Sequence, residues 1–109
     1  MRVLKFIVDG STIKQDPTCN FNGLFPAPNQ EIVAEFIFSN EWIGVPKVAA
    51  FYSVLGNEYP PRIIPKENRC MIPAEALNRP VFRMQILGSN RGNVMSTNML
   101  TVYQKGGKV

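Results

Sequence analysis

The chain has 109 residues, of which 45% are hydrophobic and 18% are charged, and its net charge is +4. This length fits one domain and leaves no room for a second. The hydrophobic share argues against disorder, which needs low hydrophobicity and high charge. The basic residues are scattered, with no two adjacent. The sequence therefore does not favour a clustered nucleic-acid-binding patch, and nucleic acid is not an expected partner.

The predicted elements begin with strands in which apolar and polar residues alternate. Arg2–Asp9 is the first, followed by a turn at Gly10 and a short return strand over Ser11–Gln15. The next segment, Asp16–Asn29, holds three prolines and is predicted to be a long loop or an edge segment. Glu31–Ser39 has the strongest alternation and is the clearest strand in the sequence.

The second half of the chain continues this pattern after a corner that contains Trp42. Pro73–Leu77 is predicted to form a single helical turn, because proline is tolerated near a helix start. The further predicted strands are Lys47–Val54, Arg62–Pro65, Arg69–Ile72, Val81–Leu87 and Val94–Gln104. About seven or eight short strands at regular spacing predict an all-β, antiparallel sandwich or small barrel. We expect one domain over residues 1–104 and a C-terminal tail over residues 105–109.

The two cysteines, Cys19 and Cys70, lie far apart and match no metal-binding spacing. We expect both to be small buried hydrophobic residues, with a disulfide between them as the alternative. The N-terminal segment is too short and too interrupted by charge for a secretion signal, so nothing points to an oxidising compartment. No segment approaches the roughly 18 apolar residues of a membrane span, so no membrane association is expected.

The chain contains no histidine. That excludes Ser-His-Asp and Cys-His nucleophilic arrangements, and it removes the commonest zinc ligand. No pair of carboxylates stands out by its context, and no phosphate-binding glycine loop is present. The sequence therefore predicts no enzyme, and no catalytic, cofactor-binding or metal site.

Three aromatic residues are candidate partner contacts: Trp42, Tyr59 and Tyr103. Tryptophan is enriched among the residues that dominate binding energy at interfaces. A lone tryptophan beside a strand corner more often fills the core, with its N–H bonded to a nearby carbonyl. We favour the core for Trp42 and keep an exposed contact as the alternative.

Two segments resemble a known family. Glu35–Phe51 reads EFIFSNEWIGVPKVAAF, which is similar to a motif of structural proteins from phages and prophages of Gram-positive hosts. That motif is a strand, Phe-Ser, an acidic residue and Trp, a Gly, and then Lys with a small residue and Phe. Downstream, Cys70–Leu77 reads CMIPAEAL and resembles the family's Cys–aliphatic–Pro–x–Glu–x–Leu segment. The resemblance covers residues 30–104.

The resemblance implies an immunoglobulin-like sandwich similar to the N-terminal domains of baseplate upper proteins and tail-fibre proteins, which attach a longer protein to the virion. Because the chain stops soon after this module, we expect a stand-alone virion component or a fragment of a longer protein. The predicted function is a non-enzymatic virion structural protein, either a tail or baseplate component or a capsid decoration protein. It would be made in the bacterial host cytoplasm.

Such a protein would act through repeated contacts with other virion proteins, in a homo-oligomer or symmetric assembly. Apolar residues on the second faces of strands, including Val33, Ile37, Val81 and Leu87, suit a chain that buries more surface in an assembly. The alternative is a host-directed module that binds carbohydrate or inhibits a bacterial defence system. A basic nucleic-acid-binding barrel is a third interpretation, and it predicts steeply salt-dependent DNA binding.

Overall fold

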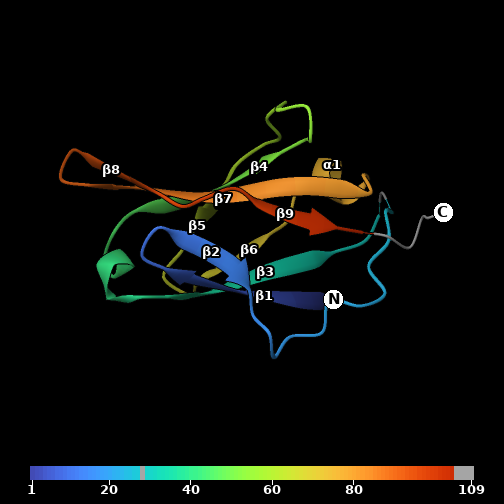
Figure 1. Cartoon of the computed structure of the whole chain (residues 1–109), viewed down its shortest axis with the longest axis horizontal. Coiled ribbons are helices and arrows are strands. Elements are labelled where there is room, and N and C mark those ends of the chain that lie inside the picture. Colours follow the sequence, from blue (N-terminus) through green and yellow to red (C-terminus); the bar gives the residue numbers. More distant parts are fainter. Residues whose placement is uncertain (28, 105–109) are drawn as a thin grey trace.

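Two β-sheets stack against each other and enclose the core in the computed structural model, which describes residues 1–27 and 29–104 (Figure 1). The predicted all-β sandwich is confirmed. The tail predicted over residues 105–109 lies outside the described residues. Sheet A has the strand order β2–β1–β3–β6. Its strands are β1 (Arg2–Asp9), β2 (Thr12–Gln15), β3 (Ile32–Phe38) and β6 (Arg69–Met71).

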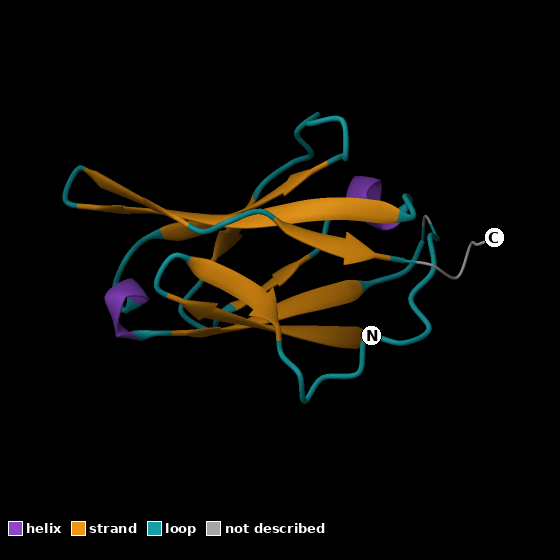
Figure 2. Cartoon of the chain, viewed as in Figure 1, coloured by secondary structure: helices purple, strands orange, loops and turns teal. Residues whose placement is uncertain are grey.

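Sheet B has β4 and β7 at its centre and the short strand β5 at one edge. Its strands are β4 (Lys47–Tyr52), β5 (Arg62–Ile64), β7 (Val81–Asn90), β8 (Asn93–Ser96) and β9 (Leu100–Tyr103). Strands β8 and β9 pair with successive stretches of the same edge of β7. Two short helices, η1 (Asn40–Trp42) and α1 (Ala74–Leu77), complete the described fold (Figure 2). The helical turn predicted near Pro73 is therefore present.

One strand pair differs from the antiparallel prediction. Strands β1 and β3 run parallel, in register from Arg2↔Ile32 to Val8↔Phe38. The cause is the segment between β2 and β3, which carries the chain back to the end of the sheet where β1 begins. A parallel neighbour needs such a long crossover, whereas an antiparallel neighbour needs only a short turn.

The predicted last strand is divided into β8 and β9 because the residues between them leave the ladder. Asn98 instead bridges the two sheets: its backbone N–H donates to Ser11 O at 3.0 Å, and its Oδ1 accepts the Ile13 N–H at 2.8 Å. The side chain of Asn98 thus takes the place of a strand neighbour for the edge strand β2. This explains why the structure has nine strands where about seven or eight were predicted.

The core follows the predicted alternation. Leu4, Phe6 and Val8 of β1 face inward and are buried, as are Phe82, Met84 and Ile86 of β7. Phe6, Phe36, Phe38 and Trp42 form a continuous row of ring contacts, with centroids 5.7 to 5.8 Å apart. Helix α1 packs its two buried residues, Ala76 and Leu77, into the same core.

Gln104 secures the end of α1 although its side chain is completely buried. Its Nε2 donates to Leu77 O at 3.0 Å and to Arg79 O at 2.8 Å, and its Oε1 accepts from Gln30 Nε2 at 3.3 Å. The last carbonyls of a helix have no partner within the helix, so they need such donors when water is excluded. Gln104 therefore joins the last strand to α1 through polar contacts.

Both cysteines are free, so the disulfide alternative is wrong. Cys70 lies on β6 beside Ala34, whereas Cys19 lies along the edge of β1 that pairs with β2, where its Sγ accepts the Lys5 N–H at 3.4 Å. The two thiols are thus separated by β1 and β3. Both side chains are half-buried, whereas the sequence predicted buried residues.

Cys70 is expected to resist alkylation in the native protein. Burial raises the pKa of its thiol from 9.0 to about 12. Because the thiolate is the nucleophile, its population at neutral pH falls about a thousandfold. Peptide mapping by mass spectrometry after timed iodoacetamide treatment measures the rate at Cys70 in the native and the urea-unfolded chain. Equal rates in the two states would contradict the burial of this thiol.

Candidate contact surface

Trp42 is not a surface contact. Its side chain is 0% exposed, and its Nε1–H donates to Gly10 O at 2.8 Å. The ring packs so closely on β7 that a Cβ atom added at Gly88 would lie 2.9 Å from Trp42 Cζ3. The favoured core placement is confirmed, and the exposed-anchor alternative is wrong. The physical reason is that η1 turns the ring inward, between the ends of the two sheets.

Tyr59 and Tyr103 both lie toward the end of sheet B opposite Trp42, Tyr59 beside Phe51 of β4 and Tyr103 on β9. Tyr103 is 65% exposed and pairs with Val81 across β7 and β9. Tyr59 is half-buried and lines a hollow of about 390 Å³ that Val81 also lines. The structure therefore brings these two candidates to one end of the sheet and leaves Trp42 at the other.

This hollow lies beside the loop that follows β4, which extends away from sheet A (Figure 2). Val54 and Leu55 of the loop are 50% and 87% exposed. The polar lining comes from Ser53, Asn57 and Arg79, so the hollow joins apolar walls to a few hydrogen-bonding groups. Small-molecule sites share that composition.

The outer face of sheet B is the larger candidate surface. Across its two central strands, the outward side chains form three pairs: Val48 with Leu87, Ala50 with Gln85, and Tyr52 with Arg83. Ile63 on β5 and Val94 on β8 flank them and are 78% and 80% exposed. Among the outward-facing residues of these five strands, Arg83 is the single charged side chain. A sheet face this poor in charge is unusual on a surface that faces only water.

The apolar end of this face is shallowly hollowed. A depression of about 520 Å³ lies there, and its lining residues are Pro46, Lys47, Val48, Ile63, Ile64, Leu87, Gly88 and Ser89. Val48, Ile63 and Leu87 stand in one cross-strand row, so the depression runs across strands rather than along one. It offers apolar surface to a partner and holds no carboxylate.

At the centre of the outer face of sheet B, the side-chain amide of Gln85 is held in place by hydrogen bonds. Gln85 Nε2 donates to Thr97 O at 2.8 Å, and Tyr52 Oη lies 3.5 Å from Gln85 Oε1. Burial, and then the nearby Glu58 carboxylate, raise the pKa of the Tyr52 hydroxyl, so it stays protonated and able to donate at neutral pH. Ala50 beside them is only 1% exposed. The side chains at this point are already held in place, which reduces the entropy lost on association.

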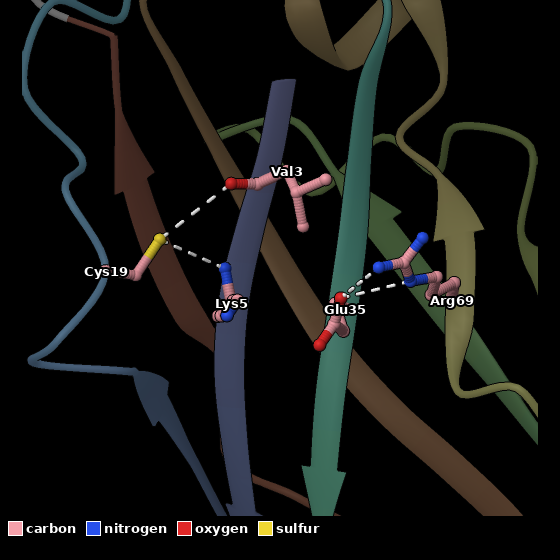
Figure 3. A network of polar contacts seen from close by, with 5 residues as sticks. All are labelled: Val3, Lys5, Cys19, Glu35 and Arg69. Atoms are coloured by element: carbon pink, nitrogen blue, oxygen red, sulfur yellow. Dashed lines mark hydrogen bonds and ion pairs between the residues drawn. The ribbon is translucent and has the colours of Figure 1, made fainter. Parts of the chain in front are cut away.

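Sheet A presents a different outer face. Its middle row is charged, with Lys5, Glu35 and Arg69 side by side on β1, β3 and β6. Arg69 Nη2 lies 2.7 Å from Glu35 Oε1, and Cys19 contacts the backbone of β1 at Val3 and Lys5 (Figure 3). Val33 on this face is only 8% exposed, whereas Ile37 is 52% exposed. A loop and a charged row therefore interrupt any apolar surface here.

A third hollow lies beside Trp42, and the Lys47 side chain lines it. Lys47 reaches into it, and its Nζ donates to Trp42 O at 3.0 Å and to Val45 O at 2.9 Å. The same Nζ lies 4.8 Å from the centre of the Phe38 ring, and burial lowers the pKa of the amine. Since its donors point at backbone carbonyls, Lys47 closes the corner between β3 and β4 rather than awaiting a ligand.

The surface residues that sequence reasoning missed are Ile63, Val94 and Leu55. Ile63 stood in a strand too short to show alternation, and Leu55 stood in a turn. Of the second-face apolar residues singled out from the sequence, Leu87 and Val81 do lie half-buried on the outer face of sheet B. Leu87 and Val81 could be identified because they are apolar residues at strand positions that the alternating pattern assigns to the solvent side.

No family model, known protein or solved structure matches this chain. Within residues 1–27 and 29–104, no three His, Cys, Asp or Glu side chains gather as metal ligands would. The helices in that part of the chain are too short and too polar for any to cross a membrane.

Proposed function

We propose that this chain is a non-enzymatic phage virion structural protein that acts through repeated protein–protein contacts. The observation that carries the contact role is the outer face of sheet B, which exposes Ile63 and Val94 and whose strands present one charged side chain, Arg83. Fully buried interface cores are depleted of charge in the same way. Weak individual contacts suffice for such a protein, because display in many copies multiplies their effect.

The phage assignment rests on the sequence resemblance of Glu35–Phe51 and Cys70–Leu77. In the fold, Trp42 and Phe51 of the first segment and Leu77 of the second are buried. The buried residues of these segments support a shared immunoglobulin-like module, while Val48 of the first segment also contributes to the outer face of sheet B. The proposed place is the tail, the baseplate or the capsid surface, among other virion proteins, after synthesis in the bacterial host cytoplasm.

The proposal predicts that Leu87→Glu lowers incorporation into particles by at least about tenfold, because a charge is then buried at a charge-poor contact. The measurement is quantitative mass spectrometry of gradient-purified virions from a phage whose own copy of the gene is deleted and complemented. Ile37→Glu, at an exposed aliphatic residue on the outer face of sheet A, is the matched control and should be incorporated normally. A wild-type chain that is abundant in the lysate but absent from virions would refute the proposal.

The hollow beside Tyr59 favours a second candidate, a host-directed carbohydrate-binding module. Tyr59 offers an aromatic wall, and Asn57 and Arg79 offer hydrogen-bonding groups. If this is the function, a glycan array gives a hit with the wild-type chain that Tyr59→Ala abolishes while Leu87→Glu retains it. Absence of any hit with the wild-type chain would remove this candidate.

A further inference from the structure

We infer that a second copy of this chain packs on the outer face of sheet B, related by a two-fold axis that runs along β4 and β7. The inference rests on the proposed function, since it names one partner of the same surface. Its basis is the content of the three cross-strand pairs, Val48↔Leu87, Ala50↔Gln85 and Tyr52↔Arg83. A two-fold interface must be self-complementary, because each patch meets a copy of itself.

A two-fold axis parallel to the strands and midway between β4 and β7 exchanges these strands across the interface. It keeps each residue at the same height along the sheet. Val48 then faces Leu87 of the second copy, which places aliphatic side chains together. Gln85 of the second copy lies above Ala50, which is only 1% exposed, so the side chains around Ala50 form the contact at this height. Tyr52 faces Arg83 of the second copy, and a guanidinium over a tyrosine ring is a favourable cation–π pair.

An axis perpendicular to the strands would be less favourable. It exchanges the two ends of the face and sets Arg83 against the aliphatic row of Val48 and Leu87. A guanidinium placed there loses water and gains no polar or aromatic partner.

The flanking strands complete the match. Ile63, Val48 and Leu87 stand in one cross-strand row that ends at Ser96 on β8. The same rotation therefore carries Ile63 over β8 of the second copy, next to the exposed Val94 on the same face. Both residues are more than three-quarters exposed in the single chain, at 78% and 80%. Pairing would withdraw this apolar surface from water, which favours association.

Charge also favours a second copy. The chain carries a net charge of +4, which would oppose self-association if the charges faced one another. The strands of the outer face of sheet B present one cation, Arg83, and the Glu58 carboxylate lies beside Tyr52. The axis therefore places Arg83 of the second copy on an aromatic ring next to an opposite charge. The Lys5, Glu35 and Arg69 side chains lie on the far sheet.

The test is analytical ultracentrifugation of the full chain from micromolar to millimolar concentration, with circular dichroism as the check on folding. The wild-type chain should show a monomer–dimer equilibrium. Leu87→Glu should raise the dimer Kd at least about tenfold, whereas Ile37→Glu should leave it unchanged. If Leu87→Glu fails to fold, Ile63→Glu on the exposed edge strand replaces it. A wild-type chain that stays monomeric throughout, or equal effects of both glutamates, would overturn the inference.

A mixing experiment tests the axis itself. Tyr52→Lys sets a lysine against Arg83 of the second copy, and Arg83→Glu removes the cation from the Tyr52 ring, so each variant alone should dimerise weakly. A one-to-one mixture should recover association. In the mixed dimer the introduced lysine of one variant faces the introduced glutamate of the other, while Arg83 of the first still meets Tyr52 of the second. No recovery on mixing would contradict this arrangement. Virion incorporation of the wild-type chain tests the proposed function separately, so the two failures are distinguishable.

Discussion

Replacing Trp42 by alanine is expected to lower the free energy of unfolding by about 3–5 kcal/mol. The ring is completely buried, packs on Phe38 with centroids 5.8 Å apart, and bonds Gly10 through its N–H at 2.8 Å. Its removal opens a large cavity and leaves the Gly10 carbonyl without its side-chain donor. Urea denaturation followed by circular dichroism measures the change.

Two comparisons make this prediction specific to the core. Gly88→Ala should cost about 1–3 kcal/mol, because the new methyl group would press on the ring from the β7 side. Tyr103→Ala, at a 65% exposed aromatic residue, should stay within about 0.5 kcal/mol of the wild type. If Trp42→Ala changed the free energy of unfolding little and Tyr103→Ala changed it greatly, the placement of Trp42 in the core and of Tyr103 on the surface would be contradicted.

Replacing Gln104 by leucine is expected to cost about 1–3 kcal/mol, because Arg79 O loses its donor and Leu77 O keeps only the Ala27 N–H. Leucine fills much of the same space, so the loss reports on hydrogen bonds rather than on a cavity. Leu77 O and Arg79 O accept from Gln104 Nε2 at 3.0 and 2.8 Å. The transition midpoint in urea, at unchanged slope, measures the effect.

Gln30→Leu is the matched control for Gln104. Gln30 is only half-buried, and its Nε2 donates to Phe25 O at 2.8 Å and to Gln104 Oε1 at 3.3 Å. We expect Gln30→Leu to cost about 0.5–1.5 kcal/mol, because the first bond is exposed to water and the second is long. Equal costs at the two positions would mean that α1 is not held by the Gln104 amide.

Strand identity was largely predictable from the sequence because it depends on local alternation. Leu4, Phe6 and Val8 repeat every second residue, and the same period marks Phe82, Met84 and Ile86. A strand exposes alternate side chains to opposite faces, so the period alone identifies the buried set. The short β5 was placed correctly within a residue, yet the exposure of Ile63 could not be inferred from so short a strand.

The candidate surface was less accessible to sequence reasoning. Tyr59 and Tyr103 were singled out by residue type, and their common position beside Val81 depends on the pairing of β7 with β9. Leu87 gave a signal as an apolar residue on a solvent-side position. Val33 gave the same signal, yet it is buried on sheet A. Alternation reports which way a side chain points, and it does not report what lies over it.

The all-β class, the inward faces of the long strands, the helical turn after Pro73 and the lack of histidine could be read from the amino-acid sequence alone. The parallel pairing of β1 with β3, the bridge that Asn98 makes to β2 and the separation of the two thiols became apparent in the folded chain. The reason is that local patterns arise from neighbours within a few residues, whereas these features join residues that are tens of positions apart. The burial of Trp42 depends on local sequence and on tertiary structure. Its residue type and its place beside a strand corner favoured the core, and the folded chain packs its ring against Gly88 of β7.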